Sequence, residues 1–508
     1  MSGVRTINER WVSPPPIVAA PRPKWFTRPM YVLLVALPIL IALTVPAKYL
    51  LGSMLAYANV LIIVMAMIRF TRQQSLQGVL HILFLTWMLA SWPLASLYLA
   101  MTFPGSYYQV LHQRRFHLDG MERLQLAMMA FLLVYVPITL ALSKRGQPFV
   151  LHSPATSSDR RTATAMLFFV MSAILLNAVS KIVSLPEPVE YVAIAGYNYL
   201  HSLMLLVGAL FPRLPFYTRA LALAFMGASG AFYMIGNHRG AAALPLALFL
   251  AGLLFFSEMR PRWKMGLVIT GAIVMPLALA LGDITRDLTK TSGFSNFEQR
   301  IEAFSRLGEY IQSTPLFARS FQRTFSTGGH TLVTMMPEPY PYLGFSFTAY
   351  VREFFERLIP GKLYYHPYYS TTALLRTYDF YITDKTSVEL SFIGSLYMLG
   401  GFIPIIIGTI FIALVHCWFG RWIGKAQRAS PYKGLFYCGM LAQTFLWGQN
   451  LDPISHFRTL VWQALAAAIL YYLLVRILIG ERRQTLPVPL PRNVLPSSLR
   501  HPVQTPTA

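Results

Sequence analysis

The chain has 508 residues, of which 55% are hydrophobic and only 12% are charged. Soluble domains carry about 25% charged residues, so this composition excludes an ordinary water-soluble protein and predicts a polytopic membrane protein. The formal net charge is +23, but the basic residues lie mostly between apolar segments. Basic residues in such connections are better explained as determinants of membrane orientation than as a nucleic-acid-binding surface.

The two ends of the chain differ from the apolar remainder. Residues 1–29 are rich in proline and basic residues, and residues 480–508 are again rich in proline. Such segments bury too little apolar surface to offset the entropy of ordering them. We therefore expect two disordered tails, both on the cytoplasmic side.

About a dozen apolar segments are candidates for transmembrane helices, since a bilayer core needs about 20 apolar residues per helix. They lie at 30–46, 50–68, 79–101, 124–142, 163–183, 191–211, 217–236, 240–257, 265–282, 389–415, 432–450 and 459–479. Basic residues concentrate in the connections that twelve spans place on the same side as both termini, which predicts cytoplasmic termini. The expected fold is all-α and integral to the membrane, with helices in 30–282 and 389–479.

The two cysteines, Cys417 and Cys438, provide neither a disulfide framework nor a set of metal ligands. They are expected to act as small apolar residues in or beside membrane helices. The sequence has no phosphate-binding glycine-rich loop, no zinc-type spacing of histidine and cysteine, and no nucleophile-elbow motif. We accordingly expect no metal and no cofactor.

A long segment, residues 283–388, separates the ninth and tenth predicted spans and is expected on the periplasmic face. Its many tyrosine and phenylalanine residues and nearly balanced charges argue against disorder. One amphipathic helix is predicted after the capping pattern Ser295-x-x-Glu298, and a second is predicted before Pro360. The loop is thus expected to be partly helical and to cover a site at the outer membrane surface.

Arg239 lies in a short polar turn, residues 236–240, between two apolar spans. A cation held at a membrane boundary is a functional hypothesis, because its guanidinium can bind phosphate in a bidentate fork. Arg239 could equally extend toward lipid headgroups as an ordinary residue at a helix end. Spacing by itself leaves both interpretations open.

The long segment contains two histidines, His330 and His366, which suit proton transfer near neutral pH. Taken singly, each is better explained as a surface or packing residue. Arg352 and Arg376 could supply a second contact to an anion, although basic residues on outer helices are usually only solvated.

Another polar cluster, residues 450–458, precedes the last predicted span and contains Asp452, His456 and Arg458. Three such side chains at a helix boundary suggest a site. Asp452 followed by Pro453 is also a common turn former, and the turn is the favoured interpretation.

Three stretches in this order are similar to the bacterial O-antigen polymerase and ligase group, integral membrane glycosyltransferases that use undecaprenyl-diphosphate-linked sugars. The stretch 238–241 resembles the short Ser-Arg-Gly turn of that group, with His238 in place of the serine. Residues 342–364 resemble its loop segment, and residues 392–401 resemble the helix after the loop. Ser395 stands where most members have glutamate, which puts a role for that carboxylate in doubt unless Glu389 substitutes for it.

The resemblance implies a bundle of the GT-C type and a metal-independent transfer between two lipid-linked oligosaccharides. Arg239 would contact the lipid diphosphate, with Arg352 or Arg376 as a second contact. His330 would remove the proton from the attacking hydroxyl, with His366 as the next candidate. The resemblance also implies the bacterial inner membrane, with a flippase and a chain-length regulator as partners beside membrane lipids.

Tyrosines of the long segment, Tyr342, Tyr364 and Tyr365 among them, could stack on sugar rings or anchor the loop at the membrane interface.

The main alternative to a polymerase is a ligase of the same group, which moves finished glycan to a lipid or protein acceptor. A polysaccharide or lipid transporter is a further alternative. It is disfavoured because the interiors of the predicted spans are nearly free of charge.

Overall fold

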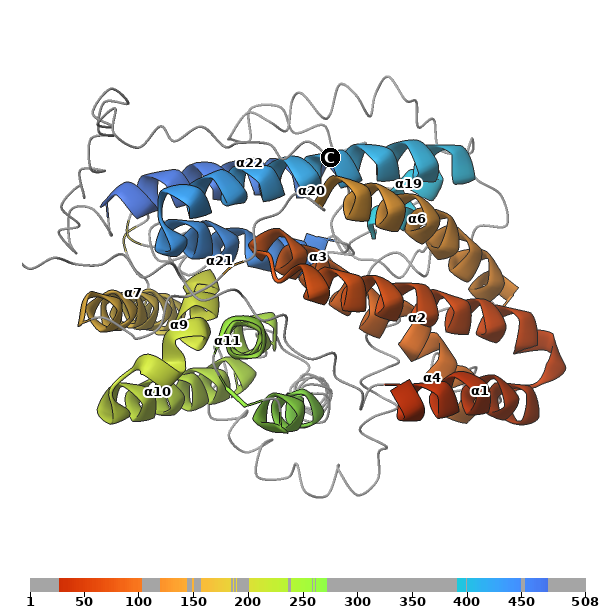
Figure 1. Cartoon of the computed structure of the whole chain (residues 1–508), viewed down its shortest axis with the longest axis horizontal. Coiled ribbons are helices and arrows are strands. Elements are labelled where there is room, and N and C mark those ends of the chain that lie inside the picture. The colour runs from red at the N-terminus through yellow and green to blue at the C-terminus, as the bar shows by residue number, and fades with distance from the viewer. Residues whose placement is uncertain are drawn as a thin grey trace, which may run out of the picture.

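The computed structural model describes residues 27–102, 119–143, 149, 157–183, 186, 189, 201–235, 239–257, 259–260, 262–271, 391–398, 400–448 and 453–473. Within these ranges the chain forms helices and the turns between them, without a strand (Figure 1). The expected all-α fold is therefore confirmed for this part of the chain.

The first half of the chain forms helices from residue 27 to residue 256. They are α1 (Thr27–Thr44), α2 (Ala47–Gln73), α3 (Leu76–Leu89), the π-helical turn η2 (Ala90–Leu94), α4 (Ala95–Thr102), α6 (Asp119–Ser143), α7 (Ser157–Ile182), the 3₁₀ turn η3 (His201–Leu203), α9 (Met204–Leu210), the 3₁₀ turn η4 (Phe211–Arg213), α10 (Phe216–Ile235) and α11 (Arg239–Phe256). Residues 262–271 are also helical.

After the long segment the chain returns as α19 (Phe392–Met398), α20 (Phe402–Ala429), α21 (Pro431–Trp447) and α22 (Pro453–Leu470). Four described segments are long and apolar enough to cross a membrane, namely Ala47–Gln73, Leu76–Tyr98, Glu122–Ser143 and Phe402–Ala429. The described part of the chain is thus all-helical and has the apolar helices of a membrane protein. The count of about twelve spans stays a prediction.

The predicted span 389–415 is wrong as a single helix. Gly400 and Gly401 have φ angles of 146° and 79°, which residues with a Cβ rarely adopt, and they end α19 and precede α20. Helix α20 then continues to Ala429, beyond the predicted end. The predicted span 79–101 contains the π turn η2 with Pro93, but the helix continues through it and Leu76–Tyr98 is long and apolar enough to cross a membrane.

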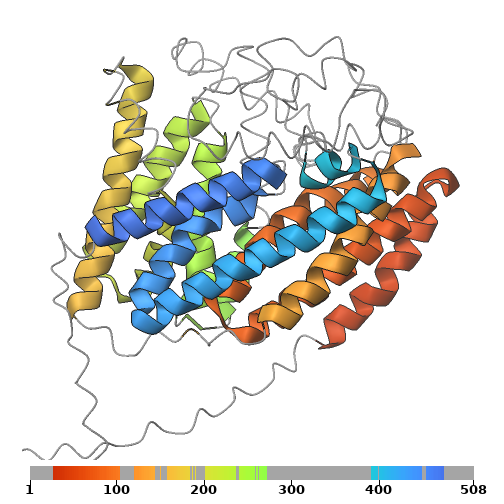
Figure 2. The ribbon, with the colours of Figure 1, turned by 90° about the horizontal axis from the view of Figure 1, so that it is seen from above.

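Helix α20 is central to the bundle, because it packs against α3, α6, α21 and α22. Figure 2 shows α20, α6, α2 and α1 lying roughly parallel to one another, with α7 at an angle to them. Helices α7, α9, α10 and α11 gather at the other side of the molecule (Figure 1). Helix α21 connects the two groups, since it packs on α3 and α20 and also on α9 and α11.

The crossing of α9 and α11 brings two backbones into direct contact. A Cβ built on Gly208 would collide with the carbonyl oxygen of Phe249, and one built on Gly252 would collide with the carbonyl oxygen of Leu205. Small residues at a crossing allow such an approach between membrane helices. This crossing fixes α11, and with it the start of α11 at Arg239.

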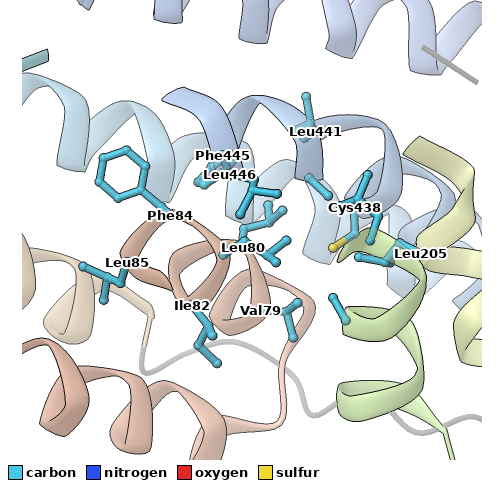
Figure 3. Packing of buried hydrophobic residues seen from close by; sticks show 14 of the residues in the cluster. Val79, Leu80, Ile82, Phe84, Leu85, Leu205, Cys438, Leu441, Phe445 and Leu446 are labelled. Carbon is cyan, nitrogen blue, oxygen red and sulfur yellow. The ribbon is translucent and has the colours of Figure 1, made fainter. Parts of the chain in front are cut away.

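The buried core lies where α3 meets α21 and α9 (Figure 3). Phe84 of α3, Phe445 of α21 and Leu205 of α9 are fully buried there. Cys438 is a free, buried cysteine whose thiol lies 3.7 Å from the carbonyl oxygen of Leu76. Cys417 is likewise free and buried, so both cysteines occupy the apolar positions expected for them.

Candidate functional site

Most residues predicted to carry the chemistry belong to the long segment and lie outside the described residues. They are His330, His366, Arg352, Arg376, Tyr342, Tyr364 and Tyr365. Asp452 and Glu389 also lie outside the described ranges. The assignments to these residues therefore stay predictions.

Arg239 is the first residue of α11. Helix α11 packs against α10, which ends at Ile235, so the two helices are adjacent in space and in sequence. The first four backbone N–H groups of a helix have no partner within that helix, and its dipole favours an anion at this end. The backbone at the start of α11, where Arg239 lies, is therefore suited to an anion.

The clearest polar site in the described residues is one that the sequence did not predict. It consists of His81 on α3, Tyr135 on α6, His416 on α20 and His456 on α22, here called the histidine–tyrosine cluster. All four side chains have no exposed surface. Three of them lie on three of the four described segments that are long and apolar enough to cross a membrane.

The four side chains form one continuous line of hydrogen bonds. The Tyr135 hydroxyl lies 2.9 Å from Nδ1 of His81 and 2.7 Å from Nδ1 of His416. Nε2 of His416 lies 2.7 Å from Nε2 of His456. The histidines are therefore arranged in series, and no three His, Cys, Asp or Glu side chains within the described residues could share a metal ion.

The start of each helix determines where its cluster residue lies along that helix. Helix α3 begins after Ser75, whose hydroxyl accepts a hydrogen bond of 3.0 Å from the backbone N–H of Gly78, and this cap places His81 in the second turn. Helix α22 begins with Pro453, a residue suited to the first helical position, and His456 follows within the first turn. Tyr135 and His416 lie well inside α6 and α20.

Aromatic rings surround the cluster. Phe70 stacks on His81 with ring centroids 4.8 Å apart, and Phe131 stacks on Tyr135 at 5.2 Å. Phe445 lies 4.2 Å from His416 and Phe84 lies 5.0 Å from it. Phe392, the first residue of α19, lies 6.5 Å from His456. An apolar shell of this kind favours neutral imidazole rings over charged ones.

At each end of the line lies a polar atom that has no partner in the described part of the chain. Nε2 of His81 and Nδ1 of His456 are buried and have no hydrogen-bond partner among the described residues. A buried polar atom left unpaired is costly, so cross-linking of helices alone does not explain these two ends.

A separate polar contact joins α2, α4 and α6. The Asn59 amide donates hydrogen bonds of 2.9 Å to the backbone oxygen and to Oε1 of Gln125. The Gln125 amide donates in turn to the Ser96 hydroxyl at 3.0 Å. Hydrogen bonds between membrane helices stabilise their association, and we assign this contact a structural role.

The sequence contained a partial signal for the cluster. His456 lies within the polar segment 450–458, for which the sequence favours a turn. His81 and His416 lie inside apolar spans, where a neutral imidazole adds no charge that would indicate a site. Only packing brings together residues separated by 281 positions, as Tyr135 and His416 are.

Comparisons with models of protein families, with curated proteins and with solved structures found no match to this chain.

Proposed function

We propose that the protein is an integral membrane glycosyltransferase that polymerises undecaprenyl-diphosphate-linked oligosaccharide repeat units at the periplasmic face of the bacterial inner membrane. The observation that carries the proposal is the position of Arg239 at the start of α11. The motifs that resemble the O-antigen polymerase and ligase group support it. The all-helical, apolar bundle is compatible with a substrate delivered by the membrane.

The start of α11 suits a diphosphate. Arg239 is followed by Gly240, Ala241, Ala242 and Ala243, so no large side chain follows in the first turn. Free backbone amides at a helix start bind phosphate oxygens, and an arginine guanidinium adds two parallel hydrogen bonds. In the proposed topology this end of α11 lies at the outer surface, where the diphosphate headgroup of a flipped lipid donor would lie.

The proposed reaction joins the growing glycan and one repeat unit. A hydroxyl oxygen of the acceptor sugar attacks the anomeric carbon of the donor, and the bond from that carbon to the diphosphate oxygen breaks. Arg239, with Arg352 or Arg376, stabilises the negative charge that develops on the departing diphosphate. His330, or else His366, accepts the proton of the attacking hydroxyl.

The test uses purified full-length protein in liposomes with a lipid-diphosphate-linked repeat unit from the source bacterium. Wild-type protein should yield a ladder of polymers on a gel, and Arg239→Ala should yield none. Arg262→Ala is the matched control, because Arg262 is an exposed arginine beyond the opposite end of α11. This control should retain the wild-type ladder.

Three results would count against the proposal. Transfer of a preformed glycan to a lipid or protein acceptor, without a ladder, would identify the ligase. A ladder from Arg239→Ala at the wild-type rate would remove Arg239 from the site. Movement of lipid-linked sugar across the liposome membrane without any new glycosidic bond would identify a transporter.

The transporter is the second candidate because of one observation, the histidine–tyrosine cluster. Titratable side chains inside a membrane bundle commonly line pathways for ions or substrates. The liposome experiment separates the two candidates, since a transporter changes the location of the substrate and a polymerase changes its length.

A further inference from the structure

One face of α20 packs on α3, α6 and α21, and the opposite face is exposed along the helix. The exposed side chains recur every three or four residues, so they form a single line on the helix surface, here called the α20 stripe. Its apolar part consists of five side chains that are between 40% and 69% exposed: Ile403, Ile407, Ile410, Leu414 and Trp418. Its basic part consists of the next three positions of the same series, all exposed: Arg421, Lys425 and Arg428.

No carboxylate on α20 or α21 balances the basic part of the stripe. The sequence has no Asp or Glu between Glu389 and Asp452. The three cations lie within eight consecutive residues, which corresponds to about 10 Å of helix. Like charges held this close repel one another, and an anion bound between them relieves the repulsion.

Aromatic side chains mark the level at which the stripe changes from apolar to basic. Trp422 stacks on Tyr437 of α21, with ring centroids 4.2 Å apart. Nζ of Lys433 lies 5.7 Å from the centre of the Tyr437 ring and 5.4 Å from that of Tyr471, so a fourth cation lies on the neighbouring helix. Tryptophan and tyrosine concentrate where acyl chains meet headgroups. The membrane boundary is therefore expected near residues 418–422.

The helix surface between the cations is open. Gly424 follows Arg421 by three residues and precedes Arg428 by four, so it lies beside both on the helix surface. A Cβ built on Gly424 meets no atom within 4 Å. A phosphate group can therefore approach α20 closely and contact the cations on either side.

The length of the apolar part suits the acyl region of one leaflet. Ile403 and Trp418 are fifteen positions apart, which corresponds to about 22 Å along a helix. One leaflet contributes about 15 Å to the hydrocarbon core. An acyl chain that begins at the level of Trp418 can thus lie against the apolar part over the full depth of its leaflet.

We propose that the α20 stripe is a binding site for an acidic glycerophospholipid of the membrane. The acyl chain lies along the apolar part, and the phosphate lies beside Gly424 and accepts hydrogen bonds from the basic part. A zwitterionic phospholipid suits the site less, because its ammonium group is repelled by the same cations. In the predicted topology the turn between α20 and α21 is cytoplasmic, which assigns the lipid to the cytoplasmic leaflet. The proposal stands independently of the proposed glycosyl transfer.

The test measures competition between lipids at Trp418, in liposomes that contain the purified full-length protein. Brominated acyl chains quench tryptophan fluorescence on contact. Each protein is compared with its own Trp418→Phe counterpart, which isolates the signal of Trp418 among the nine tryptophans. Brominated phosphatidylglycerol competes with unlabelled phosphatidylcholine, and brominated phosphatidylcholine provides the reference. Wild-type protein should prefer phosphatidylglycerol by at least about 5-fold, the factor that one basic residue near a headgroup supplies.

Two variants separate recognition of the phosphate from folding. The first removes the three exposed charges together and should abolish the preference: Arg421→Gln, Lys425→Gln, Arg428→Gln. The second, Gly424→Leu, keeps every charge and fills the open surface between them, so it should also lower the preference.

A matched control removes the same amount of charge from exposed positions outside the α20 stripe. It carries Arg69→Gln, Arg260→Gln and Arg262→Gln, and it should keep the wild-type preference. An equal fall in this control would attribute the preference to total charge and overturn the site.

Three further results would overturn the proposal. The first is equal quenching by the two brominated lipids in the wild type. The second is an unchanged preference when the basic part of the stripe carries glutamine. The third is displacement of phosphatidylglycerol by an equimolar amount of undecaprenyl phosphate, which would assign the α20 stripe to a polyisoprenyl lipid instead.

Discussion

The Nε2 atoms of His416 and His456 lie 2.7 Å apart, so one imidazole donates its N–H to the lone pair of the other. This bond ties α22 to the central helix α20 at a point without solvent exposure. The bond allows the proton to lie on either ring, because the donor and the acceptor are the same type of nitrogen. The bond therefore joins the two helices in either arrangement.

Gly448 provides the space for the His456 ring. A Cβ at this position would overlap Cε1 and Nδ1 of the His456 imidazole, so Gly448→Ala should push the ring away from His416. We expect a loss of about 1–3 kcal/mol in the free energy of unfolding, the usual cost of overpacking. Reversible unfolding in detergent micelles measures this loss.

The control is Gly227→Ala on α10, where a Cβ meets no atom within 4 Å. Alanine has a higher helix propensity than glycine, so the control should be neutral or up to about 1 kcal/mol more stable. Equal stability of Gly448→Ala and Gly227→Ala would show that the His456 ring accommodates the methyl group.

The contact of Asn59 with Gln125 should contribute to the association of α2 with α6. Asn59→Leu leaves the side-chain oxygen of Gln125 without this donor, and we expect a loss of about 0.5–2 kcal/mol. Reversible unfolding in micelles provides the measurement. The double variant Asn59→Leu, Gln125→Leu should lose less than the sum of the two single variants, because the two residues share one interaction. Additive losses would contradict a direct interaction.

The crossing of α9 and α11 should not tolerate a larger residue at Gly252. A Cβ there would collide with the backbone of Leu205 and Ala209, which cannot rotate away as a side chain can. Gly252→Ala should lower stability by about 1–3 kcal/mol and weaken the activity that depends on the position of α11. Gly266→Ala, where a Cβ meets nothing within 4 Å, is the control. A wild-type melting temperature for Gly252→Ala would show that the helices can move apart without cost.

Phe84 should be important for both packing and the cluster. Its ring is fully buried and lies 5.0 Å from His416 and 5.2 Å from Tyr135. Phe84→Ala opens a cavity beside them and should cost about 3–5 kcal/mol. Phe216→Ala on α10 is the control, since that ring is 76% exposed, and it should change the free energy of unfolding little. A loss in Phe84→Ala as small as in this control would mean that neighbouring rings fill the space.

Several features followed from the sequence because they depend on local properties. Apolar segments of about 20 residues must satisfy their backbone hydrogen bonds internally in a bilayer, and the described parts of the predicted spans are mostly helical, with a break at Gly400 and Gly401. The start of the helix at Arg239 was also predictable, within a residue, from the polar turn before it. The burial of both cysteines followed from their apolar surroundings.

The break at Gly400 and Gly401 was not predicted, because hydropathy averages over a window and does not detect a left-handed backbone angle at single residues. The π turn at Pro93 was not predicted either, because hydropathy does not register a change in the hydrogen-bond pattern within a helix.

The histidine–tyrosine cluster depended on tertiary structure alone. Four helices contribute one side chain each, and the relevant sequence separations are 54, 281 and 40 residues. Hydropathy, charge and spacing along the chain contain no information about which faces of these helices meet. The amino-acid sequence determined that this protein is an apolar helical bundle, because each span satisfies its own backbone. Packing decided which titratable groups lie within hydrogen-bonding distance, because contacts between helices depend on rotation and crossing angle.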